Sequence, residues 1–176
     1  GLKEHISITD YSFISDLIKK RDEKKKILDF DISSKKKIIL VSLKGNITNS
    51  EVENLGATFF DQFINNKANE FNLKSETLPT EHKNIVGYFV HGIKLKSYKF
   101  EKYKTKKNNK DFLIIVTGKN QPSQKEQIKF KAIENGTFYT RDLVSEPGNI
   151  LHPDEYAKRL NSLRKHGLKV NVYDEK

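Results

Sequence analysis

Extended and helical patterns of apolar residues alternate along the chain. Residues 27–32 alternate apolar and acidic side chains, a period of two that predicts a strand with one solvent-facing side. Continuous apolar runs at residues 38–41 and 112–116 predict strands buried on both faces, as in a parallel sheet. Residues 70–78 are a further strand candidate. Strands that alternate with helices predict the α/β class, with a mixed, mostly parallel sheet flanked by helices.

Apolar residues spaced three and four positions apart predict the helices. One predicted helix is capped by Thr9 or Asp10, and a second by Asn49 or Ser50. Two further helices cover residues 81–98 and 123–144, and the last begins at Pro153. Gly56, Gly87 and Gly92 lie inside these helices, where glycine costs about 1 kcal/mol relative to alanine, so close packing is expected to compensate. For Gly56 we expect a close contact between its helix and the sheet.

The last long helix leads into the strongest linker signal of the chain, residues 146–153. Pro147 and Gly148 end the predicted helix, and Pro153 suits the first turn of the next one. The long helix is expected to place one apolar face against the core, formed by Ile128, Ala132, Gly136, Tyr139 and Leu143. Short strands are predicted at residues 4–8 and 170–173.

Composition excludes several classes of chemistry. The 176 residues include no cysteine, which excludes disulfides, thiolate zinc sites and a cysteine nucleophile. Neither a glycine-rich phosphate loop, an HExxH pair nor a nucleophile elbow occurs, so we predict no catalytic and no metal-binding residue in this chain. No apolar run has the length of a membrane span and no signal-peptide pattern opens the chain, so we expect a cytoplasmic protein without membrane contact.

Individual titratable residues give little further chemistry. The five histidines lack metal-ligand spacing, and most are expected to be solvated. Glu146 follows Asp142 by four residues, which places both carboxylates on one side of a helix. A catalytic pair is conceivable, but local salt bridging with Arg141 is the simpler interpretation.

The formal net charge of +10 is concentrated in one stretch that interleaves lysines with Tyr98, Phe100 and Tyr103. Its lysines are Lys94, Lys96, Lys99, Lys102, Lys104, Lys106, Lys107 and Lys110. One interpretation is a polyanion site, in which lysines hold phosphates and aromatic rings stack on bases. We favour the other, in which the aromatic rings anchor the segment and the lysines face water. A standalone basic module that binds DNA or a nucleotide remains the alternative function.

Two segments carry a resemblance to a known family. Residues 138–153, FYTRDLVSEPGNILHP, resemble the junction sequence of the leucyl aminopeptidases, the cytosol aminopeptidases of peptidase family M17. Residues 92–105, GIKLKSYKFEKYKT, resemble a second segment of that family, in the same order and at a similar separation. Ser145, Gly148 and His152 depart from the usual Asn, Pro and Thr of the junction.

The resemblance implies more than the residues show by themselves. It implies an amino-terminal, macro-domain-like α/β domain over residues 1–145, and a linker helix with the first elements of a catalytic domain over residues 146–176. In the family, two divalent metals, manganese or zinc, sit in the catalytic domain and activate the water that attacks the peptide. No position of this chain matches their ligands, so it is expected to be inactive alone. The resemblance also implies a homohexamer and, in some bacterial members, DNA binding. Binding of ADP-ribose would rest on fold analogy alone, and we do not expect it.

Overall fold

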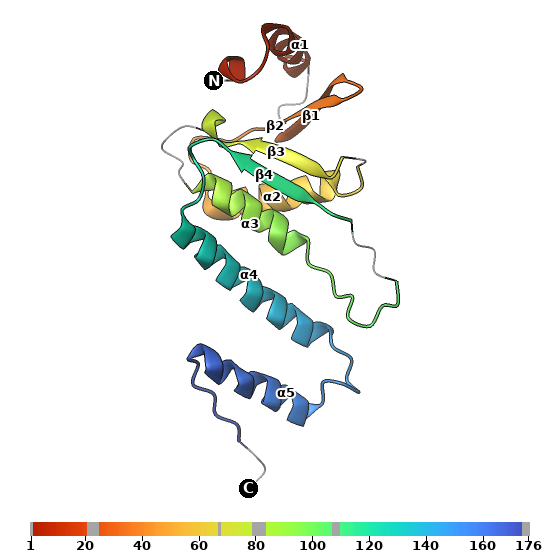
Figure 1. The fold of residues 1–176 in the computed structure, drawn as a ribbon, viewed down its shortest axis with the longest axis vertical. Helices are drawn as coiled ribbons and strands as arrows, with labels where there is room; N and C mark the ends of the chain where they lie inside the picture. The colour runs from red at the N-terminus through yellow and green to blue at the C-terminus, as the bar shows by residue number, and fades with distance from the viewer. Residues whose placement is uncertain (1, 21–24, 67, 79–83, 107–109, 174–176) are drawn as a thin grey trace.

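The computed structural model describes residues 2–20, 25–66, 68–78, 84–106 and 110–173 (Figure 1). Along the chain these residues form a 3-10 helix (Leu2–Glu4), α1 (Ile8–Ile18), β1 (Ile27–Ser33), β2 (Lys36–Val41), α2 (Asn49–Phe63), β3 (Glu70–Lys74), a 3-10 helix (Ser75–Thr77), α3 (Ile85–Lys96), β4 (Leu113–Thr117), α4 (Gln124–Ser145), α5 (Pro153–Asn161) and a 3-10 helix (Ser162–His166). Helices alternate with strands through most of this order, and the predicted α/β class is confirmed.

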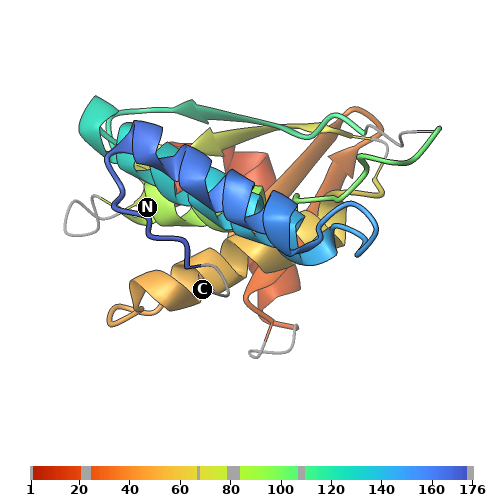
Figure 2. The same ribbon diagram turned by 90° about the horizontal axis from the view of Figure 1, so that it is seen from below.

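The strands form two small sheets. β1 and β2 pair as an antiparallel hairpin, with Ile27 opposite Val41. β3 and β4 pair in parallel, with Phe71 opposite Ile114. Mixed pairing was predicted and is present, but parallel pairing among the described residues is confined to β3 and β4. Figure 2 shows these two strands along one side of the molecule and α2 on the opposite side.

The two continuous apolar runs lie in different surroundings. β2 has an apolar cluster on each face, because Ile39 packs against the α2–α3 side and Leu40 packs with the cluster beneath α1. Contact on both faces was predicted for this strand, although its partner is antiparallel. β4 is covered on one face only, since Leu113 is 51% and Ile115 is 37% exposed. The prediction of a doubly buried strand is therefore wrong for β4.

The main core lies between the strands and the helix pair α2 and α3. Its buried side chains are Ile27, Val52, Leu55, Phe59, Phe60, Phe63, Ile85, Phe89 and Ile93. The rings of Phe71 and Phe89 meet Phe59 edge-on, with centroids 5.3 and 5.5 Å away. Val52, Phe59 and Phe63 thus repeat at helical spacing along the face of α2 that is buried in this core.

Two glycines bring α2 and α3 into backbone contact. A Cβ atom on Gly56 would lie 2.1 Å from the Phe89 carbonyl oxygen, and one on Gly92 would lie 2.0 Å from the Glu53 carbonyl oxygen. The predicted close packing at these glycines is confirmed. The predicted contact with the sheet is wrong for Gly56, because the backbone that it approaches belongs to α3.

A second, smaller cluster attaches α1 to the hairpin. Ile14 is fully buried against Leu28 and Phe30. The predicted strand at residues 4–8 is wrong, since Leu2–Glu4 is a 3-10 helix and α1 begins at Ile8. The predicted cap at Thr9 or Asp10 is also wrong. The Ser7 hydroxyl, one residue before the helix, accepts the Asp10 backbone N–H at 3.1 Å.

Capping boxes begin both of the long helices. The hydroxyls of Thr48 and Ser123 accept the backbone N–H of Glu51 and Glu126, whose carboxylates accept the cap backbone N–H in return. The cap of α2 was predicted at Asn49 or Ser50. Thr48 takes that place because it lies three residues before Glu51, the spacing that a reciprocal pair requires.

The carboxy-terminal part of the molecule has little core. α4 buries only Leu143, and Ile128 is 64% exposed, so the face predicted for this helix is buried at one end alone. Phe130 packs edge-on against Tyr88 of α3 instead, with ring centroids 5.0 Å apart. α5 contains no buried residue. The strand predicted at residues 170–173 is wrong, because none of the described strands pairs with this segment.

Candidate functional site: the basic segment and the α4–α5 junction

The basic segment begins in the last turn of α3 and continues through the loop that leads to β4. Lys94 and Lys96 belong to α3, and the remaining lysines follow it. All of these lysines that the structure describes are exposed. Lys107 lies outside the described residues. The structure therefore places the predicted polyanion-binding lysines on the surface, but spread over a helix end and a long loop.

Several of these lysines have acidic partners, either in another element or within the segment itself. The partners are Asp61 of α2 for Lys96 at 2.8 Å, Glu146 for Lys102 at 2.5 Å, and Glu101 for Lys104 at 3.7 Å. Lys110 donates to the Asn65 side-chain oxygen at 3.3 Å. A lysine held by a carboxylate has less free charge for a phosphate. The pairing thus reduces the capacity of the segment to hold a polyanion.

The aromatic residues of the segment anchor it to α4. The Tyr98 hydroxyl donates to Asp142 at 2.7 Å, and its ring lies 5.2 Å from the Phe138 ring. Burial, followed by the hydrogen bond to Asp142, raises the pKa of Tyr98. Tyr103 is 50% exposed, but its hydroxyl donates to Glu146. These contacts favour the interpretation in which the rings anchor the segment.

Glu146 is the buried centre of an ionic network. Its side chain is 1% exposed and accepts from Lys102 Nζ at 2.5 Å, from the Tyr103 hydroxyl and from Arg159 Nη1 at 2.9 Å. Hydrogen bonds from Lys102 first, and from Tyr103 and Arg159 after it, lower the pKa of Glu146 to about 2. The carboxylate is thus charged at any pH above that range. It joins three segments: the basic loop, the end of α4 and α5.

Arg159 is the α5 side of this network. Its guanidinium also donates to Glu155 at 2.8 Å, and the Tyr139 hydroxyl donates to the Arg159 carbonyl at 2.9 Å. Pairing with Glu155 and Glu146 raises the pKa of Arg159. Because α5 buries no residue of its own, these polar contacts are the main tie between α5 and the end of α4.

Both sequence interpretations of Glu146 are wrong. It does not pair with Asp142, which accepts from Tyr98, and Arg141 donates to the Leu95 carbonyl at 2.5 Å instead. The cause is local: Glu146 caps α4 with an extended backbone (φ −66°, ψ 135°), so its side chain leaves the helix surface. The sequence gives no sign of the pairing with Arg159, which lies thirteen residues further along the chain, beyond two prolines.

A second ionisable pair connects α2 and α3, and its histidine is buried. His91 Nδ1 lies 2.7 Å from Glu53 Oε1, and His91 is only 4% exposed. The expectation that most histidines are solvated is wrong for this one. Its Nε2 is buried without a hydrogen-bond partner among the described residues, and its ring lies 5.0 Å from the Phe130 ring. The pair packs the helices together, with His91 buried and the Glu53 side chain 30% exposed.

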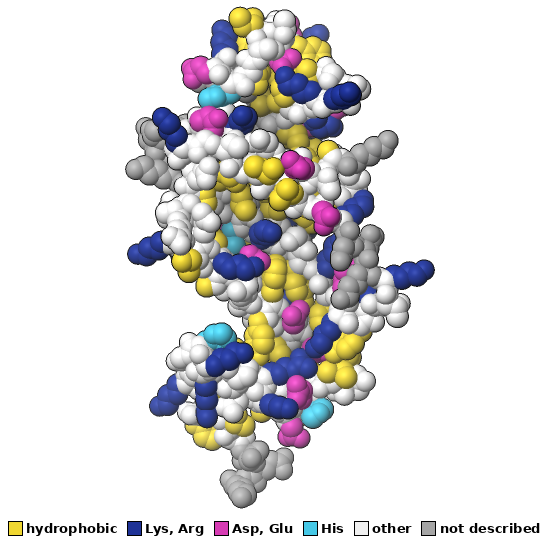
Figure 3. Space-filling view, viewed as in Figure 1, with side chains coloured by type: hydrophobic (Ala, Val, Ile, Leu, Met, Phe, Trp, Pro, Cys, Tyr) yellow, Lys and Arg dark blue, Asp and Glu magenta, His cyan; other side chains and the backbone are white. Residues whose placement is uncertain are grey.

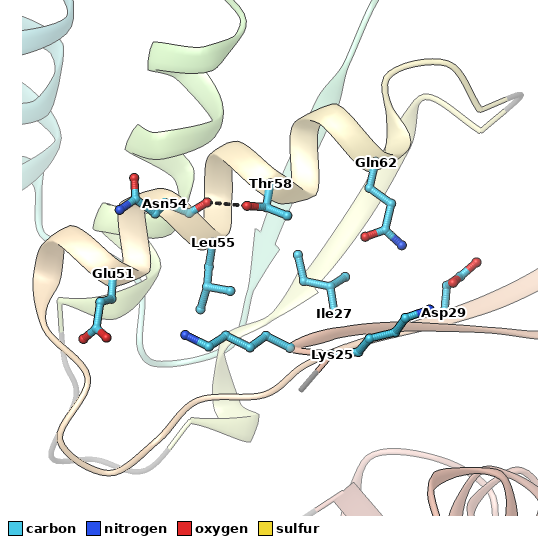
Figure 4. Close-up of a pocket in the computed structure, with 9 residues that line it drawn as sticks. Lys25, Ile27, Asp29, Glu51, Asn54, Leu55, Thr58 and Gln62 are labelled. Atoms are coloured by element: carbon cyan, nitrogen blue, oxygen red, sulfur yellow. Dashed lines mark hydrogen bonds between the residues drawn. The ribbon is translucent and has the colours of Figure 1, made fainter. Parts of the chain in front are cut away.

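The described surface has open hollows that could be considered as binding sites. The first, about 570 Å³, lies between the start of β1 and α2 (Figure 4). Ile27 and Leu55 point into it, while Glu51 is held by its capping box and the Thr58 hydroxyl by the Asn54 carbonyl. The second, about 580 Å³, lies beneath the basic segment. It is lined by aromatic rings and by both signs of charge, including Lys99, Lys110, Glu101, Asp111 and Asp142. Neither lining has the uniform charge of a phosphate site.

The described residues do not fit a two-metal centre. No group of three or more His, Asp or Glu side chains among them is arranged to hold a metal ion, and the sequence has no cysteine. No step of metal chemistry can therefore be assigned to this part of the chain. None of the helices in the described part of the chain has both the length and the apolar composition needed to cross a membrane.

Comparison with known proteins identifies related sequences. No family model matches the chain. A cytosol aminopeptidase of Afipia carboxidovorans is 38% identical over 90 residues, which are 48% of this chain and 18% of that protein. The corresponding protein of Nitrobacter winogradskyi is 36% identical over 103 residues, 55% of this chain and 21% of that protein. That of Phytoplasma mali is 39% identical over 94 residues, with 49% and 19% covered.

A solved structure shows the same fold. The bottromycin maturation enzyme BotP in complex with Mn aligns with 89% of this chain at a TM-score of 0.65 and 17% identity, using 34% of its own length. The part of BotP that aligns with this chain is thus about a third of that enzyme.

The resemblance to a metallo-aminopeptidase family is confirmed by these relatives. In particular, the chain is related to the cytosol aminopeptidases over about half of its length, and it spans only about a fifth of theirs.

Proposed function

We propose that this chain is the amino-terminal, non-catalytic region of a di-metal leucyl aminopeptidase, an enzyme that releases amino-terminal residues from peptides. The observation that carries the proposal is the similarity to cytosol aminopeptidases over half of this chain and only about a fifth of each relative. The lack of a metal-ligand cluster among the described residues is consistent with chemistry performed outside them.

The proposed division places residues 1–145 in the amino-terminal domain and residues 146–176 in the linker helix and the start of the catalytic domain. The change in packing at Glu146 supports it. Residues before Glu146 contribute both apolar clusters and Leu143, whereas α5 buries no side chain and is tied by polar contacts. Residues 144–173 also include exposed apolar side chains, such as Val144 at 82% and Tyr173 at 88%.

Further parts of the proposal follow from the family alone. The whole protein would hold two divalent metals, manganese or zinc, in its catalytic domain, act on peptides in the cytoplasm, and assemble as a homohexamer. DNA binding by the basic segment is kept as the second candidate, favoured by the net charge of +10. The acidic partners of Lys96, Lys102 and Lys104 make it the weaker one.

An activity assay tests the proposal. The 176-residue chain, supplied with Mn²⁺ or Zn²⁺, should hydrolyse leucine p-nitroanilide no faster than the same buffer and metal without protein. The protein expressed with any sequence that follows Lys176 in its gene, assayed in parallel, should be active. Metal-dependent turnover by the 176-residue chain alone would contradict the proposal, because it would require a catalytic centre within these residues.

A further inference from the structure

The hollow beneath the basic segment is lined by two pairs of aromatic rings. Phe60 of α2 and Phe112, which directly precedes β4, meet edge-on with ring centroids 4.9 Å apart. Tyr98 and Phe138 of α4 form the other pair, with centroids 5.2 Å apart. Ile64 adds a further apolar side chain. A hollow of about 580 Å³ has the usual size of a small-molecule site, and these walls can take up an apolar group.

Charged groups of both signs line the same hollow. Glu101 and Asp111 provide carboxylates, and Lys99 and Lys110 provide ammonium groups. The third carboxylate, that of Asp142, already accepts a hydrogen bond from a tyrosine of the wall. On the face drawn in Figure 3, acidic and apolar side chains are likewise interspersed with lysines and arginines. A polyanion would meet carboxylates here, whereas a ligand with one charge of each sign finds a partner for both.

The Glu101 carboxylate has only a distant partner within the described residues. Its side chain is 14% exposed, and Lys104 Nζ lies 3.7 Å from Oε1, which is too far for a hydrogen bond. An enclosed carboxylate is stabilised by a charged donor at hydrogen-bond distance. Lys110 donates to the Asn65 side-chain oxygen at 3.3 Å, and an ammonium group has two further N–H donors. The hollow therefore offers an acceptor for a cation and donors for an anion.

We propose that this hollow binds a zwitterion with an apolar side chain, either a free α-amino acid or a dipeptide. Glu101 and Asp111 would hold the ammonium group, and Lys110 and Lys99 the carboxylate. The apolar side chain would lie between the two ring pairs. The proposal concerns this chain alone and does not depend on whether the whole protein is an aminopeptidase. In an aminopeptidase, the hollow would bind products or small substrates outside the catalytic domain.

The binding should be weak. The hollow is open, so solvent and salt screen the ion pairs that a ligand forms with it. A ligand of about a dozen non-hydrogen atoms then binds with a Kd on the order of a millimolar. Such an affinity suits a site that responds to changes in the concentration of an abundant small molecule.

NMR titration of the isotope-labelled chain with L-phenylalanine tests the site. Backbone amide signals of residues in the hollow, such as Glu101 and Phe112, should shift and saturate with a Kd on the order of a millimolar. Phenethylamine lacks the carboxylate, phenylpropionate lacks the ammonium group and glycine lacks the apolar side chain. Each of these should bind at least about two- to fivefold more weakly. Tighter binding of phenylalanyl-phenylalanine would identify the dipeptide as the ligand, and weaker binding the free amino acid.

Two variants separate the contacts of the two charged groups. Glu101→Gln should weaken phenylalanine about two- to fivefold, as for loss of one partly exposed ion pair, and leave phenylpropionate unchanged. Lys110→Gln should weaken phenylalanine to a similar degree and leave phenethylamine unchanged. Glu134→Gln is the matched control, because Glu134 is 13% exposed and pairs with a lysine three residues away, but does not line the hollow. It should bind phenylalanine as the wild type does.

Three results would overturn the proposal. A wild-type chain without saturable shifts up to roughly 10 mM phenylalanine has no such site. Shifts confined to residues away from the hollow would locate the binding elsewhere. Equal binding of all three analogues, or unchanged affinity of both Glu101→Gln and Lys110→Gln, would contradict the pairing of charges. The amide spectrum of each variant shows directly whether its fold is kept.

Discussion

Gly92→Ala should destabilise the protein by about 1 to 3 kcal/mol, the usual range for overpacking a tight contact. The new Cβ would lie 2.0 Å from the Glu53 carbonyl oxygen and 2.8 Å from the Glu53 Cα. Both are backbone atoms of α2, so no side-chain rotation can relieve the clash and the two helices must separate. Side chains of α2 and α3, including Phe59 and Phe89, form most of the main core.

Gly136→Ala is the matched control in urea denaturation. Gly136 lies inside α4, and a Cβ there meets nothing within 4 Å. Alanine should therefore stabilise the protein by up to about 1 kcal/mol through helix propensity. The same substitution, glycine to alanine, should therefore lower the free energy of unfolding at Gly92 and raise it at Gly136. Equal or greater stability of Gly92→Ala would contradict the backbone contact between α2 and α3.

Glu146→Gln should release α5 from the rest of the molecule. Glutamine keeps the shape but removes the charge that holds Lys102 and Arg159, leaving both cations without their shared carboxylate. Amide hydrogen exchange should show protection factors in α5 that fall by roughly tenfold, with little change in α2 and α3, because these segments open separately. Glu155→Gln, which removes only the second partner of Arg159, should have a smaller effect.

The difference in α5 protection between the wild type and Glu146→Gln should depend on pH. The pKa of Glu146 is lowered to about 2, below its ordinary value of 4.5, so its contribution is complete above that ordinary value. It should be lost as the pH falls from about 4.5 through about 2. The wild type and Glu146→Gln should therefore differ at neutral pH and converge near the lower limit. Equal protection of α5 in both proteins at neutral pH would show that Glu146 does not hold the junction.

The fold was predictable where local pattern and tertiary packing agree. The apolar spacing of α2 and the alternation of β1 each marked a face that the structure buries. The predictions were wrong where tertiary contacts, and not the local sequence, determine burial or the start of a helix. The apolar run of β4 does not reveal that Leu113 and Ile115 lie on an uncovered face. The start of α1 depended on whether Ser7, Thr9 or Asp10 takes the cap, and all three side chains have the required oxygen.

The junction shows a different limit of sequence reasoning. The sequence marked residues 146–153 as a linker, and the structure places this segment between the end of α4 and the start of α5. The ionic network was missed, because Glu146 meets Lys102 from 44 residues earlier and Arg159 from thirteen residues later. No periodic pattern encodes such a meeting. A useful signal would have been the acid at a helix end directly before a proline, where the helix must stop and the side chain can leave the helix surface.

The gene sequence beyond the codon for Lys176 tests the central claim most directly. The account predicts an open reading frame that continues into a second domain with the lysine, aspartate and glutamate motifs of a di-metal aminopeptidase. This chain would then be about a third of the whole, as its counterpart is in the solved structure that it aligns with. A stop codon directly after Lys176 would contradict the account. The basic α/β domain would then be a protein in its own right, and DNA binding would become its leading function.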